Sequence, residues 1–477
     1  MSQDLACHIA GRRRELAPSL EQRNPADLDE VVARLPDAGE DLAAEAAAAA
    51  AGALGPLTAG VEARADALDR IGDALLEQRS ALADLIARET GKTVGDAEGE
   101  VVRAGRLFRF FGGEALRIVG ERFASTRPGV TVEVSYDPVG VIGAITPWNF
   151  PVAIPAWKIA PALAYGNAVV WKPSEHASAT ASALMEIIAS AGLPEGAVNM
   201  LLGARNAGEA LVADPAIDAI SFTGSETTGR SVIGAATRRG ARVQAEMGGV
   251  NGLIVLADAD LDAAADGAIN GAFFAAGQRC TATSRIIVER AAATALTQRI
   301  ESRMAALRIG DPRRRETQIG PLVSPRQKAA VAAATAAMRA EGRKALDGRR
   351  GEGAPACFVN PLLFTDMDPG DLVMREEIFG PVAGLMVVDS YEEALEALNA
   401  VRFGLCGGLY TTSLARAEHF KRHARVGIAM VNLPTAGVDY HAPFGGLKAS
   451  SFGAREQGRA AREFYTVTRT AYQAAPR

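Results

Sequence analysis

The sequence predicts an α/β protein built on a doubly wound, mostly parallel sheet, followed by a second α/β region. Two observations predict this class. Between residues 139 and 256, short apolar runs alternate with helical stretches, which is typical of βαβ units. A second run of the same kind extends from Ala259 to about Val431, and a chain of 477 residues is long enough for two or three domains.

The region before this sheet is predicted to be mainly helical. Apolar residues recur at the spacing of one helix face from Leu68 to Ile86, and Gly91 is well placed to end that helix. The many alanines after residue 41 favour another helix. In chain order we expect a turn and a strand over Asn24–Val32 and helices over Asp41–Ala53, Glu62–Thr90 and Glu98–Phe111.

In the region from residue 139 to residue 256, the apolar runs are predicted to be strands. Strands are expected over Val139–Ile145, Ala168–Trp171, Ala219–Phe222 and Leu253–Leu256, with helices over Ser178–Ala191 and Ser225–Arg239. The tail from Glu463 to Tyr472 alternates as a strand does, and a terminal strand of this kind often forms an interface.

Charge, hydrophobicity and cysteine content exclude several classes of protein. The chain has 51 Lys and Arg against 56 Asp and Glu, so no nucleic-acid partner is expected, because a duplex-binding surface needs a basic excess. Its 48% of hydrophobic residues excludes wholesale disorder. The four cysteines are too few for a disulfide scaffold and fit a reducing compartment; they are Cys7, Cys280, Cys357 and Cys406.

No targeting or membrane segment is expected. The first 14 residues are polar and no apolar stretch follows them, so a signal peptide is not predicted. Residues 139–157 carry no charge, but Pro147, Pro151 and Pro155 interrupt them, which favours a buried strand leading into a loop. We therefore expect a cytoplasmic protein without a membrane partner.

The segment GQRCTA around Cys280 suits a reactive thiol. A helix is predicted over Leu261–Ala276, Gly277 would break it, and Cys280 would begin the next helix. The positive end of that helix and the charge of Arg279 would both lower the pKa of the thiol. The alternative is an inert buried cysteine, the usual state of a lone Cys, although its Gly, Gln and Arg neighbours argue against this.

Two further side chains suit chemistry beside a thiol. Glu246, in QAEMGG, follows a short strand and precedes two glycines, where a carboxylate can act as a general base on water. Asn149, in TPWNFP, is held between prolines and aromatic residues, where its amide can donate to an oxyanion. The alternatives are a helix cap or surface charge for Glu246 and ordinary turn chemistry for Asn149.

Residues at two strand ends suit a nucleotide. In SFTGSETTG at 221–229, Gly224 permits a tight turn and Ser225 can cap the next helix, whose free N–H groups could hold a pyrophosphate. The segment lacks the Lys of a P-loop and the full GxGxxG spacing, so this signal is weak alone. Lys172 and Glu175, in WKPSE, follow another strand at the carboxyl edge of the sheet, where nucleotides bind in open α/β sheets.

No metal site is expected. His419 and His423 are four residues apart, which could indicate a metal pair, but the Glu that accompanies such pairs is absent. Lys421 and Arg422 would repel a cation, so a solvated helix is the better interpretation.

Seven short segments together resemble the aldehyde dehydrogenase superfamily, in sequence and in order. They are TPWNFP at 146–151, KPSE at 172–175, FTGSETTG at 222–229, EMGG at 246–249, GQRC at 277–280, EEIFGPV at 376–382 and PFGG at 443–446. The resemblance covers nearly the whole chain. It implies a Rossmann-type NAD(P)-binding domain over 1–115 and 139–248, an α/β catalytic domain over 249–448, and a β oligomerisation arm over 116–138 and 460–477, in a homodimer or homotetramer.

The resemblance also implies roles for single positions. Cys280 matches the family's nucleophile, Glu246 its general base, and Asn149 the donor to the oxyanion, together with the backbone N–H of Cys280. The implied reaction is attack of Cys280 on an aldehyde, hydride transfer to a nicotinamide, and hydrolysis of the thioester by water that Glu246 activates. The positions that match cofactor contacts are Ile145, Thr146, Pro147, Trp148, Lys172, Ser174, Glu175, Gly208, Phe222, Thr223, Gly224, Ser225, Gly229, Glu377 and Phe379.

The cofactor implied by the resemblance is NAD, with NADP as the less favoured alternative. Glu175 matches a position that holds the adenosine ribose, and a carboxylate there would repel a 2′-phosphate. Some members of the family accept NADP by moving this side chain.

Finer resemblances indicate an acidic aldehyde as the substrate. PVAIPAWKIAPALAYGN at 151–167 and CTATSRIIVE at 280–289 resemble the α-ketoglutaric semialdehyde (2,5-dioxopentanoate) dehydrogenases. The matching substrate positions are Arg103, Trp157 and Phe444, and an arginine at position 103 would suit a distal carboxylate. Arg106 and Arg109 follow Arg103 at three-residue steps, and at least two of the three are expected to face solvent.

The chain also departs from the family pattern. Val250 and Gly252 stand where many members have Lys and Pro, and the usual Ser-Gly near the C-terminal motif is Ser450–Ser451 here. Three alternatives stay open: an enzyme for another small aliphatic or aromatic aldehyde, a CoA-acylating aldehyde dehydrogenase, and a catalytically silent binding protein on this fold. Glu246 argues against the second, because CoA-acylating members generally lack it, and the set of three candidate catalytic residues argues against the third.

Overall fold

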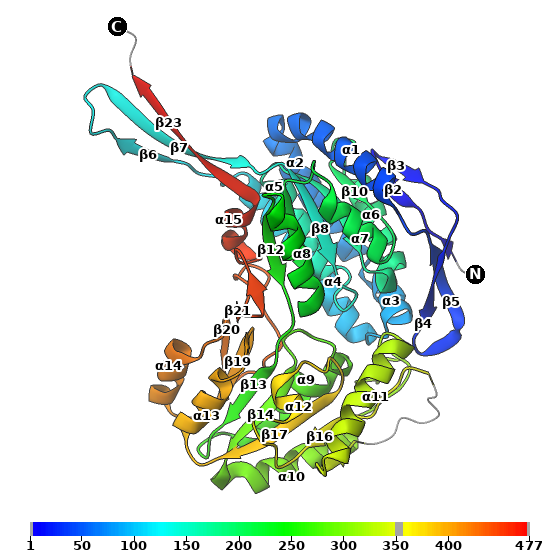
Figure 1. Cartoon of the computed structure of the whole chain (residues 1–477), viewed down its shortest axis with the longest axis vertical. Coiled ribbons are helices and arrows are strands. Elements are labelled where there is room, and N and C mark those ends of the chain that lie inside the picture. The colour runs from blue at the N-terminus through cyan, green and yellow to red at the C-terminus, as the bar shows by residue number, and fades with distance from the viewer. Residues whose placement is uncertain (1–2, 349–355, 475–477) are drawn as a thin grey trace.

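Two α/β lobes and a projecting β arm make up the chain, of which the computed structural model describes residues 3–348 and 356–474. Figure 1 shows the two sheets one above the other, each covered by helices, with the arm extending from the upper lobe. A mostly parallel, doubly wound architecture was expected, and both lobes have it.

The first sheet has a parallel centre and antiparallel edges. Its spatial order is β22 (Ser451–Phe452), β12 (Arg242–Glu246), β11 (Ala219–Thr223), β8 (Val141–Thr146), β9 (Ala168–Pro173), β10 (Val198–Met200), β2 (Cys7–Ile9) and β3 (Arg12–Arg14). The chain runs from β8 through β9 to β10, then returns to β11 beside β8 and continues to β12. The order therefore reverses between β8 and β11, and such a switch point opens a crevice at the carboxyl ends of the strands.

Helices cover both faces of this sheet. On one face lie α5 (Ala153–Ala164) and α6 (Ser178–Ala189), with α2 (Val61–Glu77), α3 (Arg79–Thr90) and α4 (Val94–Ala115) packed on them. On the other face lie α1 (Glu40–Ala59), α7 (Arg205–Ala213) and α8 (Glu226–Arg238). By length and composition alone α1 could span a membrane. Its buried alanines and its contacts with β9, β10 and α7 instead make it a covering helix of the sheet.

The second sheet repeats this plan. Its order is β15 (Ala345–Asp347), β16 (Leu362–Phe364), β17 (Val382–Val388), β14 (Thr283–Glu289), β13 (Asn251–Val255), β19 (Cys406–Tyr410) and β20 (Ile428–Val431), parallel except for β15. Its helices are α9 (Leu261–Phe273), α10 (Arg290–Ala306), α11 (Pro325–Ala340), α12 (Leu372–Arg375), α13 (Tyr391–Asn399) and α14 (Leu414–His423).

A short segment connects the two sheets. Strand β12 ends at Glu246 and β13 begins at Asn251, so residues 247–250 join the carboxyl edge of the first sheet to the amino edge of the second. The C-terminal part of the chain crosses back, because β22 pairs antiparallel with β12 in the first sheet. Side chains from both lobes therefore meet around this link.

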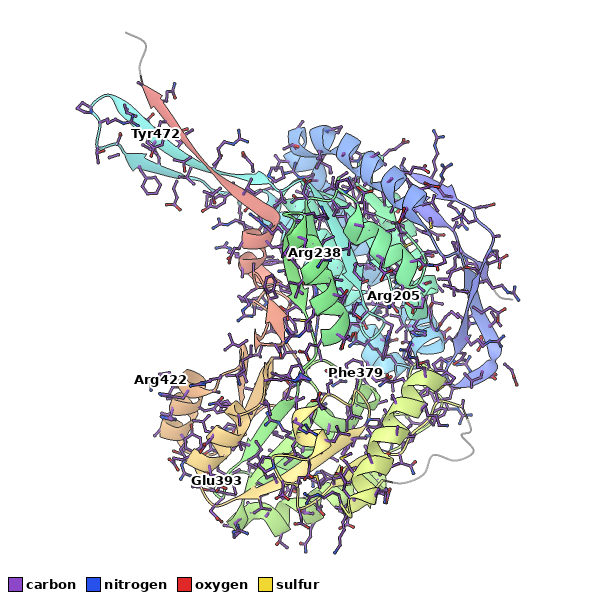
Figure 2. All side chains as sticks on the ribbon, in the orientation of Figure 1. Arg205, Arg238, Phe379, Glu393, Arg422 and Tyr472 are labelled. Atoms are coloured by element: carbon purple, nitrogen blue, oxygen red, sulfur yellow. The ribbon has the colours of Figure 1, made fainter. Side chains whose placement is uncertain are left out.

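The remaining strands form small sheets. Strands β1 (Gln3–Asp4), β5 (Asp27–Leu35) and β4 (Leu20–Asn24) form a sheet at the edge of the first lobe, and β18 (Phe403–Gly404) pairs with β21 (Leu447–Lys448). The arm consists of β6 (Glu121–Ala124), β7 (Val130–Pro138) and β23 (Thr466–Ala474), and the short α15 (Arg462–Tyr465) leads into it. Phe123 is 49% exposed and Tyr472 62% exposed on the arm, and Figure 2 shows Tyr472 far from either lobe.

Most expected elements are present with boundaries shifted by a few residues, but one predicted helix is divided in two. The single helix predicted over Glu62–Thr90 is two helices, α2 and α3, separated at Gln78, whose ψ of 9° leaves the helical range. The apolar pattern continues across the break because both helices pack on α4, so periodicity could not reveal it. Gly91 ends α3 in a left-handed conformation with a φ of 78°, as expected.

Candidate active site

The carboxyl edge of the first sheet gathers most of the predicted site residues. In the parallel register Thr146 of β8 lies beside Pro173 of β9, and Thr223 of β11 lies beside Glu246 of β12. Ile145 lies beside Phe222 across the switch point. Residues that are distant in sequence thus share one edge, as parallel strands require.

The turn after β11 is tightly packed where it leads into α8. A Cβ on Gly224 would lie 2.7 Å from the ring of Phe222, and one on Gly229 would lie 2.6 Å from the sulfur of Met247, so a larger residue at either position would have to displace one of these side chains. Ser225 caps α8 by accepting a hydrogen bond from the Thr228 N–H. The first turn of a helix leaves backbone N–H groups free for an anion.

The buried hydroxyl of Thr223 has no hydrogen-bond partner among the described residues. It lies at the end of β11, next to the glycine turn. An orphaned buried donor at this edge, together with the free N–H groups of α8, fits the pyrophosphate of a dinucleotide.

Lys172 and Glu175 lie at the neighbouring strand end, after β9. The Lys172 ammonium is 3.7 Å from the Glu175 carboxylate. Burial lowers the pKa of Lys172. Burial is the largest effect on Glu175 and acts to raise its pKa. The charge of Lys172, hydrogen bonds from the Glu175 backbone N–H and the Ser174 hydroxyl, and the charge of His176 together outweigh it, so the pKa is lowered and the carboxylate is charged at neutral pH. A charged pair of this kind can bind ribose hydroxyls.

The remaining predicted cofactor residues lie at the ends of β8 and β9 or on the helix next to α8. Thr146 accepts a hydrogen bond from the Trp171 indole at 2.9 Å. Ser174 accepts one from the His176 N–H and so begins the short helix after β9. Pro147 follows β8 directly, and Gly208 lies on α7, which contacts α8.

Aromatic rings from the two lobes meet across the crevice. Trp148, from the loop after β8, makes an edge-to-face contact with Phe379, from the loop before β17, with ring centroids 5.7 Å apart. Figure 2 places Phe379 between the lobes. Glu377, in the same loop, accepts a hydrogen bond from the Gly249 N–H at 3.0 Å. Burial, together with the nearby charge of Glu226, raises the pKa of Glu377 to about 7.

The segment that carries Cys280 follows an abrupt end of helix α9. The helix ends at Phe273, and Ala275, Ala276 and Gly277 follow with left-handed φ values of 54°, 54° and 69°. A Cβ on Gly277 would overlap the backbone oxygen of Gly380. Two alanines in this region are strained, and such strain persists only where the surrounding structure imposes it.

Side-chain amides hold this segment from both sides. Asn251 donates hydrogen bonds to the backbone oxygens of Cys280 and Ala282 at 2.8 and 2.9 Å. Asn149 donates to the Gln278 oxygen at 3.0 Å, while its own side-chain oxygen is buried without a partner. The predicted oxyanion donor therefore lies beside the segment that carries the thiol.

The predicted lowering of the Cys280 pKa was wrong. Cys280 lies in a turn before strand β14 rather than at the start of a helix, so no helix dipole acts on it. The Arg279 guanidinium pairs with Asp96 at 3.1 Å. Burial, followed by the charges of Glu377 and Glu246, raises the pKa of the thiol to about 12, although the backbone N–H groups of Thr281 and Cys280 lower it in part.

Cys280 opens into a cavity of about 350 Å³ that also contains the three predicted substrate residues. Trp157 and Phe444 stack with centroids 5.2 Å apart and form an aromatic wall. Arg103, on α4, is half-buried and has neither an ion pair nor a hydrogen bond with any residue in the described part of the chain. Arg106 and Arg109 on the same helix are exposed, as expected for two of these three.

The other cations of the cavity are paired. Lys92 forms a buried ion pair with Glu100, and Arg279 is engaged by Asp96. Among the described residues that line the cavity, Arg103 is therefore the cation that remains available to bind a ligand.

Glu246 is 2% exposed at the end of β12. One of its oxygens, Oε2, accepts a hydrogen bond from the Ser451 hydroxyl at 2.6 Å, and the other, Oε1, has no partner among the described residues. Burial raises the pKa of Glu246 well above its usual value, and the charge of Glu456 adds to this. A carboxyl group with a raised pKa and one open oxygen suits proton transfer near neutral pH.

Sequence reasoning missed three residues that hold this site. Asn251 positions the Cys280 segment, Gln278 accepts from Asn149, and Ser451 contacts Glu246. Ser451 was visible as a departure from the family pattern, but its partner was not. Asn251 and Gln278 gave no signal beyond their place inside conspicuous motifs.

Comparison with known proteins identifies relatives of the chain. The pattern of the aldehyde dehydrogenase family matches residues 13–471. An α-ketoglutaric semialdehyde dehydrogenase of Bacillus subtilis is 38% identical, over 94% of this chain and 93% of its own length. A betaine aldehyde dehydrogenase of Cereibacter sphaeroides is also 38% identical, over 86% and 84%.

Solved structures agree as well. The crystal structure of an NAD-dependent aldehyde dehydrogenase from Sinorhizobium meliloti superposes with a TM-score of 0.96 and 32% identity, over 100% of this chain and 96% of that one. Sequence pattern, curated relatives and fold agree over nearly the full length, and the chain belongs to the aldehyde dehydrogenase family.

Proposed function

We propose that this protein oxidises an aldehyde to a carboxylic acid with NAD or NADP, through a covalent intermediate on Cys280. The observation that carries the proposal is the position of Cys280. Its thiol opens into the cavity and lies close enough to Glu246 and Glu377 for their charges to raise its pKa. Asn149 contacts the segment that carries Cys280, and Glu246 is near enough for its charge to act on the thiol, so a nucleophile, an amide donor and a carboxyl group with an open oxygen are neighbours, as the reaction requires.

Each residue has a role that follows from its contacts. The thiol must lose its proton before attack, and the open Oε1 of Glu246 is an acceptor that the site offers. The amide of Asn149 gives one proton to the Gln278 oxygen and would give its other proton to the oxyanion of the thiohemiacetal. After oxidation a thioester remains on Cys280, and Glu246 activates the water that releases the acid. NAD or NADP, when bound, supplies the hydride acceptor.

The crevice at the switch point is the proposed cofactor site, and NAD the preferred cofactor. Gly224 and the first turn of α8 would hold the pyrophosphate, and Lys172 with Glu175 the adenosine ribose. The lowered pKa of Glu175 keeps its carboxylate charged, which disfavours a 2′-phosphate. Trp148 and Phe379 would border the nicotinamide end.

An acidic semialdehyde such as 2,5-dioxopentanoate is the proposed substrate. Arg103 is a cation in the cavity of Cys280 that has no ion pair with any residue the structure describes. Burial, the larger effect, lowers its pKa against the opposing charge of Glu100. A distal carboxylate would relieve the cost of this half-buried charge. Betaine aldehyde is a cation, so Arg103 disfavours it, although a betaine aldehyde dehydrogenase is among the relatives.

The proposed setting is a cytoplasmic homodimer or homotetramer. The thiols of all four cysteines are free, as in a reducing compartment. The arm carries exposed apolar residues, including Phe123 and Tyr472, which a second copy of the chain would cover.

An aldehyde panel with both cofactors tests the proposal. It contains 2,5-dioxopentanoate, succinic semialdehyde, glutaraldehyde, benzaldehyde and betaine aldehyde, assayed by reduced-cofactor absorbance. Arg103→Met should raise KM for the two acidic aldehydes about 10- to 100-fold, the worth of one charged hydrogen bond, and leave benzaldehyde nearly unchanged. The control is Arg106→Met, which removes an exposed arginine from the same helix.

Each outcome of the panel decides one part of the proposal. Absence of oxidation of every aldehyde would contradict the enzymatic function. Equal effects of Arg103→Met on acidic and neutral aldehydes would remove the substrate assignment alone.

A further inference from the structure

The Ser451 hydroxyl faces Glu246 across the last strand pair of the first sheet. Strands β12 and β22 run antiparallel, and Glu246 and Ser451 are directly opposite each other in this pair. The hydroxyl donates to Oε2 of Glu246 at 2.6 Å. Ser451 therefore contacts the proposed base without lining the substrate cavity.

Ser451 has a second hydrogen-bond partner in the turn before it. The backbone N–H of Gly446 donates to the Ser451 oxygen at 2.6 Å. The Ser451 oxygen has two lone pairs, one of which takes this N–H, and its single proton points at Oε2 of Glu246. Oε2 is therefore the acceptor in this contact, and Oε1 is the oxygen without a partner among the described residues.

The space beside Oε1 is kept open by a glycine. A Cβ on Gly445 would lie 2.8 Å from Oε1, and Gly445 has a φ of 148°, which favours glycine. Gly445 and Gly446 belong to one turn, so the same turn both orients Ser451 and leaves Oε1 free. The two oxygens of the carboxyl group thus have different surroundings.

We infer that Ser451 is a positioning residue for Glu246, fixing Oε2 as an acceptor and leaving Oε1 to take the proton of water. The inference rests on the proposed function, in which Glu246 is the base. Ser451 stands at the position where the family pattern has glycine, and glycine has no hydroxyl group that could donate to Glu246.

Other charged groups also act on Glu246, and Ser451 opposes part of their effect. Glu456 raises the pKa of Glu246, while Lys158 of α5 and Arg455 lower it. The charge of Glu246 is in turn felt by Cys280 in the segment before β14. Donation by Ser451 favours the charged form of Glu246, so loss of the hydroxyl should raise the pKa further.

Ser450 provides a matched control. Its hydroxyl accepts a hydrogen bond from the Gly404 N–H at 3.0 Å, and its backbone oxygen accepts from the Met247 N–H at 2.8 Å. Ser450 is therefore a buried neighbour with a structural hydroxyl that does not bond to Glu246.

The test compares Ser451→Ala, Ser451→Thr and Ser450→Ala in the full enzyme with NAD. The rate of thioester hydrolysis after the first turnover is measured by stopped flow from pH 5 to 10. For Ser451→Ala we expect the pKa of the acidic limb to rise by about one unit and hydrolysis at neutral pH to slow roughly tenfold, with little change in KM. The Ser451→Thr variant, which keeps a hydroxyl, should have the same pH profile of thioester hydrolysis as the original enzyme. The Ser450→Ala variant should also leave this profile unchanged.

An unchanged profile for Ser451→Ala, or equal shifts for the Ser451→Ala and Ser450→Ala variants, would overturn the inference. Unfolding midpoints of each variant show whether a change in rate follows from lost stability. Failure of the proposed function looks different. In that case the Glu246→Gln variant would retain steady turnover. If instead turnover of Glu246→Gln stalls after the burst while Ser451→Ala keeps the original pH profile of thioester hydrolysis, only the role of Ser451 is removed.

Discussion

Alkylation of Cys280 should rise steeply with pH, because its thiol is protonated at neutral pH. The pKa is raised from 9.0 to about 12, so about 1,000-fold less thiolate is present at pH 8 than in an ordinary cysteine. A more basic thiolate is more nucleophilic, which raises the rate of its reaction by about 20-fold. Alkylation by iodoacetamide should therefore be about 50-fold slower than that of an exposed cysteine, with a slope near one in a plot of log rate against pH up to pH 10.

The charge of Glu377 supplies a second, directional test. The pKa of Glu377 is about 7, so above pH 7 its carboxylate is charged and raises the pKa of the thiol. Glu377→Gln removes this charge, so the pKa of Cys280 should fall and alkylation at pH 8–9 should become faster.

Peptide mass spectrometry gives the rate for Cys280 alone, with the buried Cys7, Cys357 and Cys406 as unlabelled internal controls. If the rate of Cys280 alkylation in the enzyme without substitutions levels off below pH 9, this reasoning is refuted.

Two further variants test the cofactor site and the turn before Cys280. Glu175→Gln removes the carboxylate that disfavours a 2′-phosphate, so the ratio of kcat/KM for NADP to that for NAD should rise about tenfold in steady-state assays; an unchanged ratio would contradict the role of Glu175. Gly277→Ala should lower the free energy of unfolding by about 2–5 kcal/mol in urea, because its Cβ would overlap Gly380 and its φ is positive. Gly240→Ala, at a similar φ but in open space, should cost only about 1–2 kcal/mol, and equal costs for the two would show that the overlap is unimportant.

Much of the site could be predicted from the sequence because parallel strands bring their ends together. Lys172, Thr223 and Glu246 each follow an apolar run, so placing the runs in one parallel sheet places these residues on one edge. The chemistry of such strand ends depends on local sequence, and the motifs there are short and continuous.

Contacts between distant segments could not be predicted in the same way. Arg279 stands next to Cys280 in sequence, but its charge is taken up by Asp96, 183 residues away, so the local argument for a low pKa failed. Ser451 reaches Glu246 across 205 residues because the C-terminal segment returns to the first sheet as an antiparallel edge strand. Neither partner has a periodic or spacing signal.

The most direct test of the account is the first turnover of Glu246→Gln with NAD and 2,5-dioxopentanoate. If Cys280 is the nucleophile and Glu246 the base for hydrolysis, this variant gives a burst of about one NADH per active site, then a stall, and an acyl group on the peptide that contains Cys280. Steady turnover without a burst, or an acyl group on any other residue, would contradict it.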